Sequence, residues 1–315
     1  GGVATITKSF KPAIDITIPE PLFPEQVRHF LDRRIHIDSF SGIKAAKNHG
    51  PIDQILPQFG TTLPDVDDYD EALPVARFAP SDRSIMDDLP HSKDTGIMLH
   101  SVLEQIDFRQ AGHAPDPSAL TVPGTETCTI LESAIQLHMT EFISTDMAVL
   151  RDQTALIIWH TLNAPLDGSD LVLKNLPNRI HEIEFYYPFP TPSHDALTEA
   201  SPCSGFMHGF IDMIFLFNNK YYIIDWKSNY IEDGYSTKAI ENNIHVMHYD
   251  LQMNIYASAL IRWLKKLIPD FNYERHFGGI YYLYLRGMNR DNPESGIYFY
   301  RPENEAIITQ QISNT

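Results

Sequence analysis

The chain has 315 residues, of which 43% are hydrophobic and 21% are charged, so a packed globular core is expected rather than disorder. The formal net charge is −17, whereas proteins that bind nucleic acids usually carry a basic surface. Composition alone therefore argues against a DNA enzyme, and any DNA substrate would have to be delivered by another surface. No apolar run approaches the roughly 20 residues that span a bilayer, so no association with a membrane is expected.

The two cysteines, Cys128 and Cys203, lie far apart in the chain. They form neither a disulfide framework nor a CxxC metal motif, which predicts a protein of the reducing cytoplasm. The first residues, Gly-Gly-Val-Ala-Thr, lack the features of a signal peptide, and we interpret them as a cut inside a longer protein or as a tag remnant. No GxxxxGK[ST] loop is present, so the chain is expected to carry no ATPase motor.

The predicted elements fall into two regions. Residues 1–92 are rich in proline and include an acidic run at residues 65–71. Proline removes backbone hydrogen-bond donors and shortens helices, so this region is predicted to be a connecting arm with only short pieces of structure. From residue 93 to residue 315 the hydrophobic pattern is regular, and this part is predicted to be the folded domain.

The folded domain is predicted to contain both helices and strands. Apolar residues at helical spacing predict helical regions from residue 94 onward, at 127–162 in one or two pieces, and at 244–268. Alternating, β-branched or aromatic residues predict strands at residues 181–187, 209–217, 220–227 and 279–285. Helix, strands, helix and strand in this order predict an α/β fold.

One predicted hairpin brings two aspartates together. Asn218 and Asn219 tolerate positive φ angles and are predicted to form a two-residue turn, which places Asp212 directly across from Asp225. Alternation puts Lys227 on the same face, together with Phe210, Ile214 and Leu216. Opposed side chains have Cβ atoms about 4.5–5.5 Å apart. Two carboxylates at that distance repel on an apolar face, and a hard divalent cation such as Mg²⁺ relieves the repulsion. The alternative is a solvated face with Lys227 as a surface ion-pair partner.

Two segments of this hairpin resemble a known family. Residues 209–212 (Gly-Phe-Ile-Asp) and residues 224–229 (Ile-Asp-Trp-Lys-Ser-Asn) resemble the PD-(D/E)XK nuclease motif as it occurs in RecB-type helicase–nucleases. The similarity continues in order over roughly residues 94–302, through the segments at 99–104, 182–185, 248–252, 276–279 and 285–287. The resemblance implies a restriction-endonuclease-like core, in which helices flank a central mixed sheet.

The resemblance also implies a metal site. Its ligands would be His100, Asp212, Asp225 and the backbone carbonyl of Trp226, with Mg²⁺ as the metal and Mn²⁺ as a substitute. Family members usually have tyrosine where this chain has Trp226, but a backbone ligand does not depend on the side chain. Without the resemblance, His100 would be interpreted as an ordinary core histidine.

Four further residues receive catalytic roles from the resemblance. Lys227 would be the catalytic lysine, and Glu182 the additional acidic residue, with Glu184 on the same strand face as the alternative. Gln252 and Tyr256 match the family's Gln-x-x-x-Tyr motif. Their spacing puts both on one helical face, where they would orient the lysine or contact DNA. Arg286 is predicted to make a structural salt bridge rather than a phosphate contact.

The resemblance implies a Mg²⁺-dependent exodeoxyribonuclease of the exodeoxyribonuclease V type, which hydrolyses DNA during double-strand-break repair and DNA degradation. Its implied partners are DNA and RecC-like and RecD-like subunits, with RecA as a further candidate. Two alternatives remain at this point. One is a non-catalytic docking module for a recombinase or a RecC-like subunit. The other is a stand-alone nuclease of the same superfamily, although such enzymes usually carry four cysteines for an iron–sulfur cluster and this chain has two.

Overall fold

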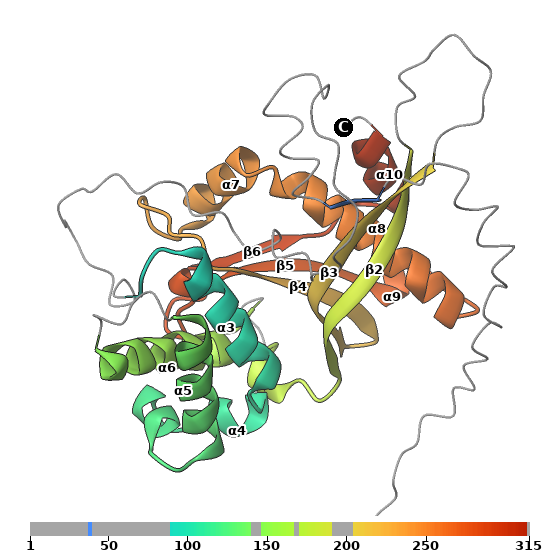
Figure 1. Ribbon diagram of the computed structural model, residues 1–315. Coiled ribbons are helices and arrows are strands. Elements are labelled where there is room, and N and C mark those ends of the chain that lie inside the picture. Colours follow the sequence, from blue (N-terminus) through green and yellow to red (C-terminus); the bar gives the residue numbers. More distant parts are fainter. Residues whose placement is uncertain (1–36, 40–88, 140–145, 167–169, 191–203, 314–315) are drawn as a thin grey trace, which may run out of the picture.

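The computed structural model describes residues 37–39, 89–139, 146–166, 170–190 and 204–313 (Figure 1). Most of the predicted arm, residues 1–92, therefore lies outside the described residues, and the boundary near residue 92 stays a prediction. The first helix of the predicted domain begins at Lys93, and the Ser92 hydroxyl caps it by accepting a hydrogen bond from the Thr95 amide at 3.2 Å. In the described part of the chain, no helix combines the length and the hydrophobicity that a membrane-spanning segment needs.

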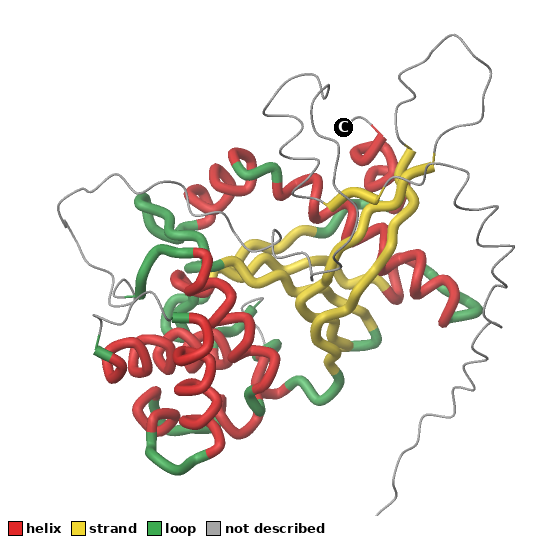
Figure 2. The backbone as a smooth tube through the Cα atoms, viewed as in Figure 1, coloured by secondary structure: helices red, strands yellow, loops and turns green. Residues whose placement is uncertain are grey.

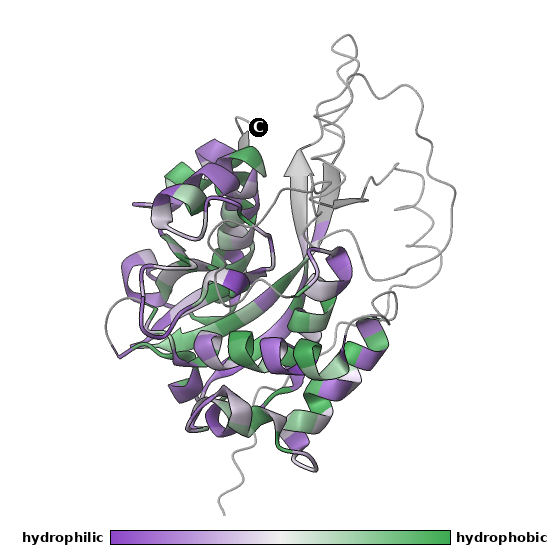
Figure 3. Ribbon diagram, turned by 90° about the vertical axis from the view of Figure 1, so that its left-hand side faces the viewer, coloured by the Kyte–Doolittle hydropathy of each residue, from purple (hydrophilic) through white to green (hydrophobic). Residues whose placement is uncertain are grey.

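Helices pack on a central sheet, as Figures 1 and 2 show. The helices are α3 (Lys93–Gln105), α4 (Phe108–Gly112), α5 (Glu126–His138), α6 (Met147–Asn163), α7 (Thr237–Val246), α8 (Tyr249–Leu267), α9 (Tyr273–His276) and α10 (Glu305–Ser313). Short 3-10 helices occupy Pro117–Thr121, Leu173–Asn175 and Leu285–Gly287. Apolar and hydrophilic residues alternate along the helices in Figure 3, as expected for helices that bury one side.

The sheet has six strands in the described part of the chain, in the order β1-β3-β4-β5-β6, with β2 paired to β3. The strands are β1 (Ile37–Ser39), β2 (Arg179–Pro190), β3 (Ser204–Phe217), β4 (Lys220–Lys227), β5 (Phe277–Tyr284) and β6 (Ile297–Tyr300). The pairs β1–β3 and β4–β5 are parallel, and the other pairs are antiparallel. The predicted α/β fold, a mixed sheet flanked by helices, is confirmed.

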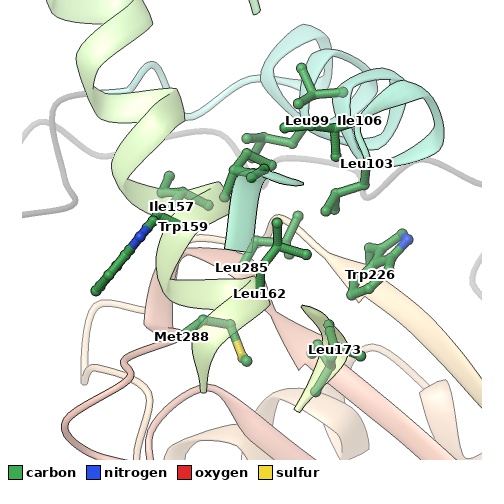
Figure 4. Packing of buried hydrophobic residues seen from close by; sticks show 14 of the residues in the cluster. Leu99, Leu103, Ile106, Ile157, Trp159, Leu162, Leu173, Trp226, Leu285 and Met288 are labelled. Atoms are coloured by element: carbon green, nitrogen blue, oxygen red, sulfur yellow. The ribbon is translucent and has the colours of Figure 1, made fainter. Parts of the chain in front are cut away.

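Two hydrophobic clusters lie on opposite faces of the sheet. The first joins α3, α5 and α6 to the sheet, and Leu99, Leu162 and Trp226 belong to it (Figure 4). The second joins α7, α8 and α10 to the sheet, and Ile223 and Tyr282 belong to it. Each face is therefore covered by helices, so charged side chains in the middle strands lie between two apolar layers.

The predicted hairpin between β3 and β4 is confirmed. Asn218 and Asn219 have φ angles of 48° and 62°, and the ladder runs from Phe217 opposite Lys220 to Met213 opposite Ile224. Two consecutive residues with positive φ give the turn whose twist matches that of the flanking strands. The ladder ends at the pair Met213–Ile224, one residue before Asp212 and Asp225, so the direct pairing of the two aspartates stays a prediction.

The predicted facing of β3 is wrong at one end. Ile211 and Ile214 both belong to the second cluster, whereas Met213 belongs to the first. Regular alternation would place Ile211 with Met213, so the alternation shifts by one residue at Asp212. Phe210 therefore does not share a face with Ile214. The physical cause is a break in the β2–β3 ladder. Glu182 has a φ angle of 49° and is the residue of β2 that is missing from the ladder at this point.

The long helix predicted at residues 244–268 is also wrong as a single element. It forms two helices, α7 and α8, separated at Met247 and His248. His248 has a φ angle of 55°, in the left-handed region, where no right-handed helix continues. The apolar spacing runs across the break, so periodicity alone does not reveal it. After the break, α8 runs along the second face of the sheet, so Gln252 and Tyr256 lie next to the strands.

Candidate active site

Three elements bring three candidate metal ligands together. His100 lies on α3, Glu182 on β2 and Asp212 on β3, and one ligand atom of each lies within 4.8 Å of the others. His100 Nδ1 is 3.6 Å from Asp212 Oδ1. Carboxylate oxygen atoms suit Mg²⁺ and Mn²⁺, and an imidazole nitrogen adds a donor that first-row transition metals prefer. The group shares His100 and Asp212 with the predicted ligand set, but it contains Glu182, which was predicted to be catalytic, in place of Asp225.

The backbone of Trp226 faces the same site. Its amide donates a hydrogen bond to Asp212 Oδ2 at 2.6 Å, and its carbonyl oxygen accepts one from His100 Nε2 at 3.1 Å. The indole packs in the first hydrophobic cluster and is 3% exposed (Figure 4). The side chain and the backbone of Trp226 thus make separate contacts, so the backbone contacts do not depend on the indole.

Asp225 lies beside the group of three ligands. Its carboxylate is buried, and Oδ2 is 2.7 Å from Lys227 Nζ. Burial, and then the charges of Asp225 and Glu182, raise the pKa of Asp212 well above its usual range. The Trp226 amide and the Lys227 ammonium oppose this shift. The carboxylates of Glu182, Asp212 and Asp225 lie near the single ammonium of Lys227. A bound divalent cation would offset their remaining negative charge.

Lys227 occupies a buried pocket of polar and aromatic groups. Its Nζ donates a hydrogen bond to Gln252 Oε1 at 3.1 Å and lies 4.0 Å from the ring centre of Tyr249 and 4.8 Å from that of Tyr282. The electron-rich faces of these rings attract a cation. Only 3% of the lysine side chain is exposed, so the pocket defines where the ammonium lies.

The Gln-x-x-x-Tyr pair lies against this lysine. Gln252 and Tyr256 are each 3% exposed, and Gln252 Nε2 donates a hydrogen bond to the Tyr256 hydroxyl at 3.0 Å. The Tyr282 hydroxyl donates to Gln252 Oε1 at 2.6 Å. These contacts favour orientation of the lysine over direct contact with DNA. Burial, with the charge of Asp225 second, raises the pKa of Tyr282 well above its usual value, so its hydroxyl is protonated at neutral pH.

Two further predicted residues can be placed. Glu184 accepts hydrogen bonds from the Tyr186 hydroxyl at 3.0 Å and from His208 Nε2 at 2.9 Å, so its carboxylate is engaged outside the ligand group and Glu182 is the better candidate. Arg286 is 2% exposed and donates to three backbone carbonyl oxygens, those of Ser228, Leu89 and Pro90. These three contacts are structural, as expected, but they are hydrogen bonds to the backbone.

The sequence did not single out Glu104, Tyr249 or Tyr282. Glu104 follows His100 by one helical turn on α3 and makes a hydrogen bond with Glu182; burial raises the pKa of Glu104, and the hydrogen bond opposes the shift. The i, i+4 spacing from His100 was the available signal. Tyr282 lies beside Asp225 in the parallel β4–β5 ladder, and no local pattern reveals that pairing.

Comparison with known proteins gives relatives of one kind. No protein-family model matches the chain. The RecBCD enzyme subunit RecB of Escherichia coli K12 is 31% identical over 292 residues, which cover 84% of this chain and 22% of the relative. RecB of Haemophilus influenzae is 31% identical over 77% of this chain and 20% of the relative. RecB of Buchnera aphidicola subsp. Schizaphis graminum is 30% identical over 68% of this chain and 18% of the relative.

The chain spans about a fifth of the length of the curated relatives it matches. Most of the chain is aligned in each of these three matches, and the aligned portions far exceed a single motif. The α/β fold, with a mixed sheet flanked by helices, agrees with the fold that the sequence predicts for such a relative. The chain therefore belongs to the RecB family.

Proposed function

We propose that this chain is the nuclease domain of a RecB-type helicase–nuclease and hydrolyses DNA phosphodiester bonds with the help of Mg²⁺. One observation carries the proposal. His100, Glu182 and Asp212 converge within 4.8 Å, and the Asp225–Lys227 ion pair lies directly beside them. Carboxylates, an imidazole and a buried ammonium in one place are the groups that metal-assisted phosphodiester hydrolysis requires. The order of these residues along the chain is that of the PD-(D/E)XK motif.

The residues divide into a metal-binding and a catalytic set. His100, Asp212, Asp225 and the Trp226 carbonyl would hold Mg²⁺, and Mn²⁺ would substitute. When bound, the metal would polarise a phosphate oxygen and lower the pKa of a water molecule. The Lys227 ammonium would offset the negative charge that builds up on the phosphate oxygens during attack. Gln252 and Tyr256 hold the lysine, and Glu182 adds a carboxylate on the β2 side. Attack of a water molecule on phosphorus would break the bond to the 3′ oxygen, which would leave as a 3′ hydroxyl with a proton from that water, and would leave a 5′ phosphate.

The relatives suggest the partners. Each of them is named as the RecB subunit of a RecBCD enzyme. We infer that RecC-like and RecD-like subunits assemble with the full-length protein in the cytoplasm, with RecA as a further candidate partner. The net charge of −17 supports delivery of DNA by such partners, since this chain alone attracts phosphate poorly. A purely docking role has no observation in its favour.

The test is DNA cleavage by the full-length protein with end-labelled linear DNA. We expect cleavage with Mg²⁺, none with EDTA, and loss of cleavage in Asp225→Ala. Asp270→Ala is the matched control, because it removes an exposed aspartate in the turn after α8. Cleavage that persists in EDTA, or an Asp225→Ala protein as active as the parent, would overturn the proposed function.

A further inference from the structure

We propose that Tyr282 is a positioning residue for Lys227, and that its hydroxyl acts by anchoring the side-chain amide of Gln252. This inference rests on the proposed nuclease function and names a residue that neither the Gln-x-x-x-Tyr pair nor the metal-binding set includes. Tyr282 is fully buried on β5 and lies beside Asp225 in the β4–β5 ladder. It therefore acts on the substrate only through its neighbours.

The Tyr282 side chain contacts the lysine pocket in two ways. The ring centre lies 4.8 Å from Lys227 Nζ, and Tyr249 presents a second ring to the same atom at 4.0 Å. The hydroxyl donates a hydrogen bond of 2.6 Å to Gln252 Oε1, the oxygen that also accepts from Lys227. The Tyr282 ring thus lies against the Lys227 ammonium, and the Tyr282 hydroxyl holds the Gln252 oxygen that accepts from this ammonium.

The Gln252 amide is held at both ends. Tyr282 binds its oxygen, and Tyr256 accepts a hydrogen bond from its nitrogen at 3.0 Å. A lysine ammonium has only donors, so it needs the oxygen end of the amide to face it. With both ends anchored, the amide has no free rotation about its last bond, and the oxygen stays 3.1 Å from Nζ.

Asp225 competes with Gln252 for the Lys227 ammonium, so the anchoring of the Gln252 amide affects where the ammonium lies. Its Oδ2 lies 2.7 Å from Lys227 Nζ, and the same carboxylate is a candidate metal ligand. If the amide oxygen of Gln252 moved away, Asp225 would hold the ammonium more closely and the lysine would be displaced from the position of the reacting phosphate. Tyr282 therefore keeps the lysine between a neutral acceptor and a charged one.

The variant Tyr282→Phe removes the hydroxyl and keeps the ring. Because the Tyr282 hydroxyl holds the oxygen that accepts from Lys227, we expect kcat for DNA cleavage by the full-length protein to fall about tenfold or more, as for a misplaced catalytic group. The KM for DNA and the affinity for Mn²⁺, measured by calorimetry, should not change. Gln252→Ala/Tyr282→Phe should be no slower than Gln252→Ala, because the hydroxyl acts through Gln252.

Tyr284→Phe is the matched control. Tyr284 lies two residues further along β5, is equally buried and pairs with Lys227 in the β4–β5 ladder, but it donates its hydroxyl to Asn243 Oδ1 on α7 at 2.9 Å. We expect Tyr284→Phe to keep the parent kcat. A parent kcat in Tyr282→Phe, an equal loss in Tyr284→Phe, or additive effects of Gln252→Ala and Tyr282→Phe would each overturn the inference.

Crystal structures of the parent protein and of Tyr282→Phe separate this inference from the proposed function. We expect the contact between Lys227 Nζ and Gln252 Oε1 in the parent and its loss or lengthening in the variant. Unchanged positions of both side chains in the variant would overturn the positioning role. A parent protein that does not cleave DNA would overturn the proposed function, whereas the two structures would still decide whether Tyr282 positions the lysine.

Discussion

At the residue scale, Asp225 and Lys227 form one buried ion pair but are expected to fail differently when replaced. Asp225→Ala removes a candidate ligand, so affinity for Mn²⁺ should fall and high metal concentration should restore part of the cleavage. Lys227→Ala leaves the carboxylates in place and removes a charge that competes with the cation, from its position 2.7 Å from Asp225 Oδ2. Metal should then bind equally well or better.

The two variants are distinguished by calorimetric Mn²⁺ titration beside a nuclease assay. Loss of a contact that matters mainly in the transition state lowers kcat without weakening metal binding, so Lys227→Ala should lose cleavage by about two orders of magnitude or more. Lys227→Ala protein that cleaves DNA at the parent rate would show that this lysine is not catalytic.

His181 should make the stability of the protein depend on pH. Burial, with the charge of Arg179 second, lowers the pKa of His181 to about 4 from an ordinary value of 6.5. The Arg179 side chain donates to His181 Nε2 at 3.2 Å, which requires a neutral ring. Between these two pKa values the unfolded chain binds a proton that the folded chain does not, so this contribution to stability is lost as the pH falls from about 6.5 to 4.

The measurement is urea unfolding of the parent and of His181→Gln between pH 7.5 and 4.5. Other groups titrate in this range, so the informative quantity is the difference between the two proteins. The parent should lose more stability than the variant as the pH is lowered. Parallel pH profiles of the two proteins would contradict the assignment.

At the scale of the element, the β3–β4 turn sets the register of the hairpin that carries the site. Asn219 has a φ angle of 62°, where a β-branched side chain is strained. We expect Asn219→Val to lower the free energy of unfolding by about 1–2 kcal/mol. Asn219→Gly, which suits positive φ, should leave the stability near that of the parent.

Urea unfolding measures the two Asn219 variants, and a nuclease assay shows whether the turn matters for the site. Asn219→Val should also reduce cleavage, because a register slip by one residue turns Asp225 to the other face. Equal stability of the valine and glycine variants would argue against a turn with positive φ at this position.

The break between α7 and α8 illustrates an element that local pattern did not predict. Residues 244–268 have continuous apolar spacing, yet the chain turns at His248, which has a left-handed conformation. A single helix over this range would not bend at Met247 and His248. The left-handed conformation is confined to one residue, and α8 beyond it packs against β5 and α10 in the second cluster.

At the scale of the whole molecule, charge opposes the proposed substrate. With a net charge of −17, the isolated chain should bind DNA weakly. Few phosphates would be neutralised, so the logarithm of the affinity should fall only shallowly with the logarithm of the salt concentration. Fluorescence anisotropy with labelled oligonucleotides over a range of salt concentrations measures both quantities. Tight binding at physiological salt would reveal a basic surface that the net charge conceals.

Local chemistry explains what the sequence alone determined. The Asn218–Asn219 turn, the extent of β4, the α/β order and the family resemblance all depend on short segments, where turn geometry and hydrophobic alternation act over a few residues. The position of Asp225 and Lys227 on this hairpin followed from the same rules. His100 was assigned from the resemblance, and the fold then brought it to 3.6 Å from Asp212.

Only the tertiary structure decided the rest. The shift of alternation at Asp212 depends on the positive φ of Glu182 in the neighbouring strand. The position of Tyr282 beside Asp225 depends on parallel pairing between strands whose sequences lie about 50 residues apart. Contacts of this kind are set by burial of both sheet faces against helices, which no short segment encodes. The sequence therefore determined which side chains were candidates for the site, and packing across the sheet decided which of them lie together.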